Sequence, residues 1–307
     1  MAEALNRTTG GLSIEMMTYY EKRFLERAMK QLVLEEGAQK STHGKNSGKS
    51  IVFNRKTPMS LATTALSEGA NPSVSLMAGS AVSCTLAEYG KSAKITKFLT
   101  LTGIDANNAE NIEVLGQNMG ETLNRLAGNA LSAGFTASFA NAKKASTIKS
   151  SDTLDSADVR TTVQNLELAQ AQMYSDGYFL GKIQPVSKTG LVTDSTWVNS
   201  AVYSGTEVKK LYKGEQGSMY GVRFLLSTEK MSAVGTGSSS TVTTYYNFIH
   251  GKDAFGAYDL EGDMPKLYIV NGADSNNPTD RYTTISWAGA YVAKVLNSAW
   301  GYALRTA

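Results

Sequence analysis

The longest regular pattern in this chain is a helical one over residues 108–133. Glu110 and Glu113 favour the first turn of a helix there, and Gly134 is typical of a helix end. Apolar residues return at helical spacing and fall on one stripe: Ile112, Leu115, Met119, Leu123, Leu126 and Ala130. This helix is the strongest structural prediction from the sequence, so any fold considered for the chain has to contain it.

The first hundred residues predict a second helix and a long β-structure. Residues 14–36 have the alternating apolar and charged pattern of an amphipathic helix, and residues 37–50 are typical of a loop. Strand patterns follow at 50–57 and from about 75 to 96, on either side of a polar segment with proline and glycine. Two extended segments around a polar tip predict a long two-stranded loop rather than a compact hairpin.

The rest of the chain predicts one more helix and several short strands. Residues 135–152 are typical of a linker, and residues 156–173 predict a helix. Short strands are predicted at 178–184, 220–227, 243–250, 265–270 and 282–296. We find no internal repeat. The order of a helix, a β-arm, a long helix and then mixed segments predicts an α+β fold.

Composition is that of a folded protein with one large or two smaller domains. The chain has 307 residues, of which 42% are hydrophobic and 19% charged, and its net charge is +3. So small a net charge excludes nucleic-acid binding by bulk charge, although a local patch remains open. No apolar run is long enough to span a membrane, and the N-terminus lacks the basic segment followed by an apolar one that a secretory signal has. We therefore expect a protein that folds in a cytoplasm.

The sequence is poor in the residues that most catalytic and metal sites use. Cys84 is the single cysteine, and the two histidines are His43 and His250. An intramolecular disulfide, a thiolate metal cage and a three-histidine zinc site are therefore excluded. The segment GKNSGKS (44–50) is one residue too short for a phosphate-binding loop, and a strand pattern follows it where a helix is required. We expect no catalytic, cofactor-binding or metal-binding residues; an enzyme that uses 44–50 on a phosphorylated substrate is the weaker alternative.

Basic residues gather between positions 40 and 56, where the chain has no acidic residue. The five are Lys40, Lys45, Lys49, Arg55 and Lys56. Three interpretations stay open: a solvated face, a contact with the acidic surface of a neighbouring molecule, or a contact with the phosphates of DNA.

Ordered blocks along nearly the whole chain, from Tyr19 to about Asn297, resemble one protein family. The blocks are YYEKRFLERA (19–28), GKSIVFNRKTP (48–58), LSEGANP (66–72), EYGKSAKIT (88–96), LGQNMGETLNRLAGNALSAG (115–134), LDSADVRTTVQNL (154–166), MYGVRFLLS (219–227), HGKDAFGAYDLEG (250–262) and TTISWAGAYVAKVLN (283–297). Together they resemble the major capsid proteins of podoviruses related to Escherichia phage N-4. The resemblance rests on many blocks in order rather than on one short motif.

This resemblance implies the HK-97-type (Johnson) capsid fold, an α+β architecture with four named parts. Residues 1–47 would form an N-terminal arm, and residues 48–97 an extended E-loop that reaches over a neighbouring subunit. Residues 98–152 would form the P-domain with its long spine helix, and residues 153–255 the A-domain. Residues 256–307 would return to the P-domain sheet.

The same resemblance implies a structural role without catalysis. The chain would be a major capsid protein that assembles as hexamers and pentamers into the icosahedral shell around phage double-stranded DNA. It implies as partners further copies of the chain, a scaffolding protein, a portal protein, a decoration or cement protein and the packaged DNA, with no membrane and no cofactor. The protein would be assembled in the cytoplasm of a bacterial host and reside in the virion.

Two alternatives belong to other classes of protein. One is an encapsulin-like shell protein of a cellular nanocompartment, which would share the capsid fold. The other is a free-standing adhesin or binding module, which would stay monomeric.

Function is expected in the arm and the E-loop, which would join subunits, rather than in a pocket. Candidates for contacts between subunits are Glu21, Lys22, Arg23, Phe24, Arg27, Lys49, Arg55, Lys56 and Glu68. Candidates for contact with DNA on the inner surface are Lys40 and Lys45.

Overall fold

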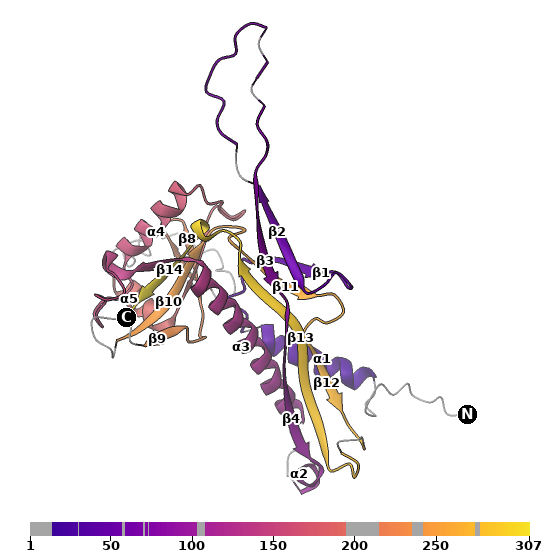
Figure 1. Cartoon of the computed structure of the whole chain (residues 1–307). Helices are drawn as coiled ribbons and strands as arrows, with labels where there is room; N and C mark the ends of the chain where they lie inside the picture. Colours follow the sequence, from indigo (N-terminus) through magenta and orange to yellow (C-terminus); the bar gives the residue numbers. More distant parts are fainter. Residues whose placement is uncertain are drawn as a thin grey trace.

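The computed structural model is an α+β structure with two main sheets, one long helix and a projecting hairpin (Figure 1). The long helix is α3 (Asn108–Gly134), which confirms the strongest sequence prediction almost to the residue. The structure describes residues 14–29, 31–56, 59–69, 71–72, 74–102, 108–194, 215–234, 242–273 and 277–307.

The first sheet packs against α3. Its path runs β1 (Gln39–His43), β11 (Phe255–Leu260), β13 (Tyr282–Val295) and β12 (Lys266–Val270), and β4 (Ala87–Thr96) pairs with β13. Apolar side chains of α3, including Ile112 and Met119, share a buried cluster with Ile285 and Trp287 of the sheet. Trp287 Nε1 also donates a hydrogen bond to Asn118 Oδ1 of α3 at 3.1 Å. The helix stripe read from the sequence is therefore the face that the sheet covers.

The helix α1 (Ile14–Met29) packs along α3 at very short range. Two glycines of α3 allow this approach, because side chains there would collide with the backbone of α1. A Cβ atom at Gly116 would lie 2.5 Å from the carbonyl oxygen of Phe24, and one at Gly120 would lie 2.5 Å from that of Ala28. The two helices are thus fitted to each other within one chain.

The predicted helix 14–36 is too long, because α1 ends at Met29 and the chain then turns into the interior. The backbone around Leu34 is bound there by two buried side chains. Asn124 Oδ1 accepts a hydrogen bond from Leu34 N at 2.7 Å, and Lys182 Nζ donates one to Leu34 O at 2.8 Å. The following strand β1, which falls in the predicted loop 37–50, pairs in parallel with β11.

The second sheet lies at the other end of α3. Its strands run in the order β5 (Thr136–Phe139), β14 (Gly301–Thr306), β10 (Thr243–His250), β6 (Phe179–Ile183), β8 (Val222–Leu226) and β7 (Glu215–Met219), with β9 (Ser232–Val234) on β10. The helices α4 (Ser156–Leu168) and α5 (Pro185–Thr193) contribute Val159, Val163 and Leu191 to its core.

This topology corrects two of the expected domain boundaries. Residues 136–139 and 301–306 were expected beside the spine helix and in the first sheet, but both belong to the second sheet. The reason is their pairing: β14 lies between β10 and β5. These contacts join strands far apart in the sequence, which no local pattern reveals.

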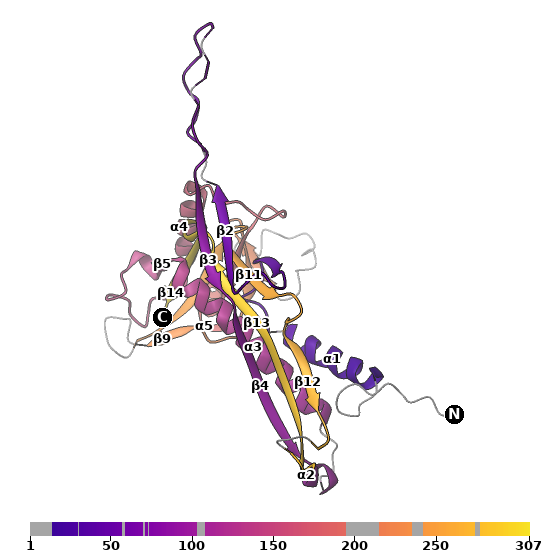
Figure 2. The ribbon, with the colours of Figure 1, turned by 45° about the vertical axis from the view of Figure 1, so that its right-hand side comes forward.

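The projecting hairpin consists of β2 (Ser50–Lys56) and β3 (Gly79–Thr85). They pair from Ser50–Thr85 at the base to Lys56–Gly79 at the far end. Figure 2 shows the tip of the hairpin standing well clear of the two sheets. It is shorter than the expected loop 48–97, because residues 87–96 form β4 and pair with β13.

Several short elements lie outside the sequence predictions. They are α2 (Lys97–Thr102), α5, β1, β7, β9, β11, β14 and the strand β5 with the turn η1 (Ala140–Ala142) inside the expected linker. The helix expected at 156–173 ends at Leu168. None of the helices in the described ranges is both long and apolar enough to cross a membrane.

Candidate contact surfaces

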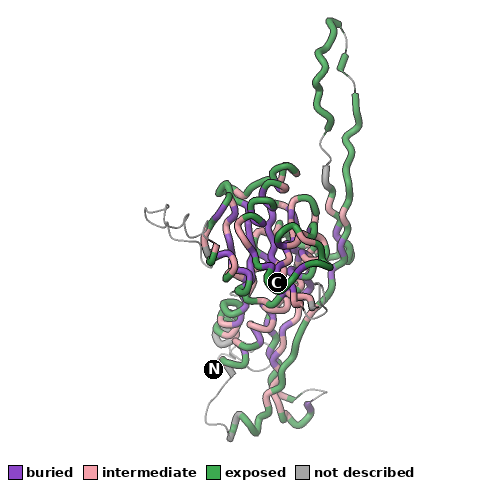
Figure 3. Tube along the Cα trace, turned by 90° about the vertical axis from the view of Figure 1, so that its left-hand side faces the viewer, coloured by how far each residue is buried: buried purple, intermediate pink, exposed green. Residues whose placement is uncertain are grey.

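The tip of the hairpin, defined here as residues 59–78, is exposed at every described position (Figure 3). Its apolar side chains are as open to solvent as its polar ones: Leu61 is 88% exposed, Val74 97% and Leu76 95%. Met59, Leu66 and Met77 are each at least half exposed as well. Several large apolar side chains on one loop, all uncovered by the described part of their own chain, are typical of a surface that another molecule covers.

The base of the hairpin is anchored in the body. Ile51 and Cys84 face each other across the two strands and share a buried cluster with Leu86 and Tyr258. The rings of Phe53 and Tyr258 lie 4.4 Å apart. Burial raises the pKa of the Cys84 thiol, so the cysteine is an inert packed side chain. The hairpin is therefore held at one end and offers its tip to another molecule.

The charged face of α1 carries four of the residues predicted to join subunits. Glu21 and Lys22 are exposed. Arg23 pairs with Glu113 of α3 at 3.0 Å, and Arg27 donates to Gln117 Oε1 of α3 at 2.9 Å. Both arginines therefore fix α1 to its own chain, although their exposure leaves room for a second contact.

Phe24 is a correction to the predicted contact residues. Its side chain is 1% exposed and lies in the cluster that α1, α3 and the first sheet form. The apolar stripe of the amphipathic helix suggested a docking face, but the two glycines of α3 bring that face against the same chain. A side chain closed off in this way has no surface to offer a neighbour.

The remaining predicted contact residues lie along the hairpin. Lys49 is exposed at its base, where its carbonyl accepts from Leu86 N at 2.9 Å. Glu68 is exposed on the tip. Arg55 and Lys56 pair through their backbones with Ser80 and Gly79, and their side chains lie outside the described part of the structure.

Lys40 and Lys45, the candidates for DNA contact, lie at and beyond β1. The Lys40 ammonium is 2.9 Å from a carboxylate oxygen of Glu35, so its charge is already paired. The side chain of Lys45 forms no ion pair within the described residues, but its backbone N–H lies 3.4 Å from Glu261 Oε2. The segment 44–50 leads into β2 and not into a helix, as the sequence predicted.

A further exposed apolar surface was not predicted. The short helix α2 lies at the far end of β4 from the hairpin (Figure 1) and carries Phe98, Leu99 and Leu101, which are 77%, 60% and 77% exposed. The sequence signal is the run KFLTLT, which is too short to define a helical period.

Buried titratable groups hold the turn after α1 rather than form a reactive site. Lys182 is 1% exposed and its Nζ lies 4.4 Å from the centre of the Phe255 ring. Burial lowers the pKa of Lys182 well below its usual value, and burial together with Lys182 does the same to the pKa of His250. Tyr174 Oη, 3.2 Å from His250 Nδ1, donates to the carbonyl of Gly37 at 2.8 Å.

The described ranges contain no group of three or more His, Cys, Asp or Glu side chains that could hold a metal ion. What the surface offers is an apolar tip on an anchored hairpin, a charged face on α1 and an apolar end at α2.

Comparison with known proteins finds solved structures of similar fold. The capsid of Ralstonia phage GP4 matches with a TM-score of 0.67 at 13% identity, over 99% of this chain and 95% of that one. The capsid of cyanophage P-SCSP1u matches with a TM-score of 0.66 at 14% identity, over 90% of this chain and 88% of that one. The virus-like particle from Pyrococcus furiosus matches with a TM-score of 0.56 at 10% identity, over 95% and 100%.

These likenesses show the fold: the chain has the α+β HK-97-type fold of phage capsid proteins, as the resemblance implied. None of the protein-family models matches the sequence, and no curated protein matches it either.

Proposed function

We propose that this chain is a major capsid protein of a tailed bacteriophage, which assembles as hexamers and pentamers into an icosahedral shell around double-stranded DNA. The observation that carries the proposal is the hairpin tip: in a capsid fold, a hairpin anchored at its base carries six large apolar side chains that are each at least half exposed. Exposed apolar side chains on such a projection are stabilised when a second molecule covers them. A shell of identical subunits supplies that molecule at every position.

The free energy gained by burying the tip supports this assignment. Full burial of one large apolar side chain contributes about 1.5–3 kcal/mol. The tip exposes six of them: Met59, Leu61, Leu66, Val74, Leu76 and Met77. Part of their burial energy offsets the ordering of the loop and the loss of free motion. The remainder is repeated at each copy, so a modest contact per subunit suffices for a stable closed shell.

The parts of the capsid fold fit the observed elements with adjusted boundaries. The E-loop corresponds to residues 50–85, and the P-domain to α3 with the first sheet. The A-domain corresponds to the second sheet with α4 and α5, including residues 136–139 and 301–306. The N-terminal arm would then be the segment before α1, while α1 itself belongs to the P-domain.

Further parts of the proposal rest on the resemblance alone. They are a kinship with phages related to Escherichia phage N-4, a scaffolding protein, a portal protein and a decoration or cement protein as partners, a role without catalysis, assembly in the host cytoplasm and residence in the virion. For contact with DNA, Lys45 is a better candidate than Lys40, because Glu35 already pairs with Lys40.

Electron microscopy and sedimentation of the purified full chain test the function. The chain is to be expressed alone and together with the genes that flank its own. Isometric shells, or rings of five and six subunits, are the expected result. A chain that remains monomeric at several concentrations under both conditions would contradict the proposal and favour a free-standing binding module.

The encapsulin-like alternative is kept because the virus-like particle from Pyrococcus furiosus has a similar fold. Its TM-score of 0.56 is lower than the 0.67 of the Ralstonia phage capsid. The contents of particles isolated from the native source distinguish the two: double-stranded DNA supports the phage capsid, and an enzyme cargo supports the compartment.

A further inference from the structure

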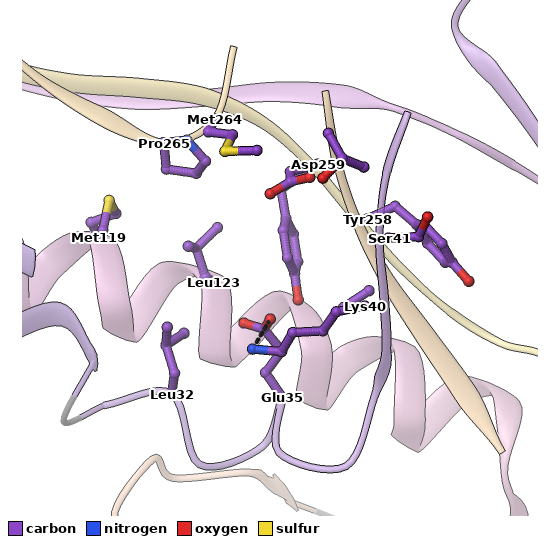
Figure 4. A pocket seen from close by; sticks show the side chains of 13 residues that line it. Leu32, Glu35, Lys40, Ser41, Met119, Leu123, Tyr258, Asp259, Met264 and Pro265 are labelled. Atoms are coloured by element: carbon purple, nitrogen blue, oxygen red, sulfur yellow. Dashed lines mark ion pairs between the residues drawn. The ribbon is translucent and has the colours of Figure 1, made fainter. Parts of the chain in front are cut away.

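The first sheet is covered on one side of β13 and open on the other. Asp259 of β11 and Ala87 of β4 both pair with Tyr291, so β11 and β4 lie on opposite sides of β13. On the side of β11, a groove of about 360 Å³ lies beside α3 and the turn after α1 (Figure 4). Two of its charged side chains, Glu35 and Lys40, already pair with each other at 2.9 Å. On the other side, the outer edge of β4 meets no further strand within the described residues.

Two hydrogen bonds fix which backbone groups of β4 point to this outer edge. Directly after β4, Lys97 N donates to Arg281 O of the opposite strand at 2.8 Å. Backbone groups of an antiparallel pair alternate in direction, so odd-numbered residues of β4 face β13 and even-numbered residues face outward. Leu86 N, one residue before β4, follows this alternation, because it donates to Lys49 O at 2.9 Å and not to β13. The outward-facing residues considered below are Glu88, Gly90, Ser92 and Lys94.

The outward N–H and C=O groups of these four residues have no hydrogen-bond partner in the described part of the chain. All four residues are exposed. Gly90 shows most directly that the backbone itself is open, because a residue without a side chain is exposed only through its backbone. In Figure 3 the strand that descends from the base of the hairpin is exposed along most of its length. An open edge ten residues long is a template on which another strand can pair.

A second β4 in antiparallel orientation fits this edge, because it offers the same outward groups. When Ser92 of one copy lies opposite Ser92 of the other, Gly90 of each copy lies opposite Lys94 of the other. These three pairs consist of outward-facing residues, so each pair can exchange two backbone hydrogen bonds. The added strand ends before Leu86, whose N–H is already bound to Lys49 O. Registers shifted toward Leu86 would bring the second strand against Lys49.

The side chains that point toward α3 agree with this register. Tyr89 of each copy would lie opposite Ile95 of the other, and both side chains are half-buried at the margin of the core that α3 and the first sheet form. Their contact would extend this apolar cluster from one copy to the next. On the same face, Lys91 would lie opposite Ala93, so no two lysines oppose each other.

The charges on the other face of β4 are compatible with pairing as well. Lysines on an edge strand often prevent a second strand from adding. The ammonium of Lys94, however, lies 4.5 Å from the centre of the Tyr282 ring of its own chain, so it is held over the sheet. Opposite Lys94 the second copy has Gly90, which leaves room for the long side chain. Glu88 of the second copy lies diagonally from Lys94, within reach of an ion pair.

We propose that β4 pairs with β4 of a second copy of the chain, antiparallel and about a two-fold axis, with Ser92 at the centre. The inference rests on the proposed shell function, because the second copy is a neighbour in the shell. It deepens that function by assigning a second kind of contact. The β4 contact joins identical surfaces, which a closed shell supplies at its two-fold positions. The hairpin tip, in contrast, would reach a different surface of its neighbour.

The variant Ser92→Pro tests the proposal, because proline removes an N–H that the subunit itself does not use. We expect the isolated subunit to keep its circular dichroism and nearly its unfolding temperature, while the yield of closed shells falls about 10-fold or more. Lys91→Pro is the matched control: the N–H of Lys91 faces β13, so this variant should lower the unfolding temperature of the subunit itself. Shells of Ser92→Pro that are as abundant and stable as the wild type would refute the proposal.

A cysteine in place of Ser92 identifies the occupant, whether or not the proline variant folds. Opposed residues of a hydrogen-bonded pair have Cα atoms about 5.5 Å apart, which suits a disulfide. Oxidation of assembled Ser92→Cys shells with diamide should therefore give a covalent dimer of the chain on a non-reducing gel. Glu88→Cys is the control within the same strand. Its two copies would lie at opposite ends of the paired strands, about 26 Å apart at 3.3 Å per residue, and should stay monomeric.

The unaltered chain serves as the blank for this cross-link, because its single cysteine, Cys84, is buried and should give no dimer. Ser92→Cys shells without the dimer, or with a cross-link to another protein instead, overturn the proposal. Failure of the unaltered chain to form any shell would instead count against the proposed function.

Discussion

The hairpin tip and α1 differ most in where their apolar side chains lie. At the tip, Leu61, Val74 and Leu76 are 88%, 97% and 95% exposed. In α1, Phe24 and Ala28 are each 1% exposed and pack against α3. The resemblance placed both segments among the parts that would reach a neighbouring subunit. The structure shows that α1 packs on its own chain, so we expect changes at the tip to affect assembly and changes in α1 to affect folding.

Replacing the tip gives the largest expected difference between the two regions. A chain in which residues 57–78 are replaced by Asn-Gly keeps the register of β2 and β3, which pair up to Lys56 and Gly79. We expect the subunit to fold with nearly unchanged circular dichroism and unfolding temperature, and to form no closed shells in electron micrographs.

Deletion of residues 1–36 is the counterpart of this experiment. It removes Phe24, Ala28 and Leu34 from two buried clusters, so we expect an insoluble or unfolded chain rather than a soluble subunit. A soluble, folded deletion variant would show that α1 is an arm after all, and normal shells from the tip replacement would remove the tip as the joining surface.

Single substitutions repeat the comparison at smaller scale. Phe24→Ala should lower the free energy of unfolding of the subunit by about 3–5 kcal/mol, because it opens a cavity in a packed core. Leu76→Ala should leave that free energy within about 0.5 kcal/mol, because the side chain is 95% exposed, and should lower shell yield instead. Chemical denaturation and sedimentation, applied to both variants, measure the two effects.

A buried acidic residue of α4, the helix that packs on the second sheet, allows a test of stability against pH that involves neither the tip nor α1. Asp158 in α4 is 8% exposed, and burial, then the charge of Asp155, raises its pKa to about 6. Because the folded pKa lies above the unfolded value, the contribution to stability is complete below about pH 4 and is lost as pH rises through 6.

The wild type should therefore lose up to about 2–3 kcal/mol between pH 4 and pH 7.5 relative to Asp158→Asn. Thermal unfolding of isolated subunits across that range measures the difference. Equal pH profiles for the two proteins would mean that the carboxyl ionises normally.

The smallest expected effect concerns the ion pair that fixes α1. Arg23 and Glu113 are 3.0 Å apart, with side chains 41% and 39% exposed. Pairs so open to solvent contribute less than about 1 kcal/mol, so Arg23→Gln should barely change subunit unfolding. A clear fall in shell stability with that small change would mark Arg23 as a contact between subunits, while unchanged shells would leave it as a local pair.

Local patterns in the sequence predict the regular elements well where one stripe or one alternation is long. The helix 108–134, the strands at 50–56 and 282–295, and the separation of two extended segments by a long loop all follow from such patterns. Short elements such as α2 and β9 escape, because six or fewer residues do not fix a period. The resemblance of ordered blocks supplied the capsid fold, which periodicity could not.

The candidate contact sites, too, were only partly predictable from the sequence. The sequence pointed to the hairpin because charge and polarity are visible residue by residue. It could not separate Phe24 from a docking residue, because an apolar helix face looks the same whether it meets its own chain or a neighbour. It also could not predict that Asp259, Tyr291 and Glu35 line one groove, since only the pairing of β11 with β13 and the turn after α1 bring these residues together.

By itself, the sequence determined the longer elements, their order, the scarcity of groups for catalysis and, through resemblance, the fold. Those properties depend on neighbours in the chain or on the order of blocks, so the linear sequence is enough to predict them. Only the tertiary structure decided which apolar faces are closed and which stay open, that Gly116 and Gly120 admit α1, and that residues 301–306 cross to the second sheet. Burial is a property of distances in space, and here it separates the part that folds the subunit from the part left for a partner.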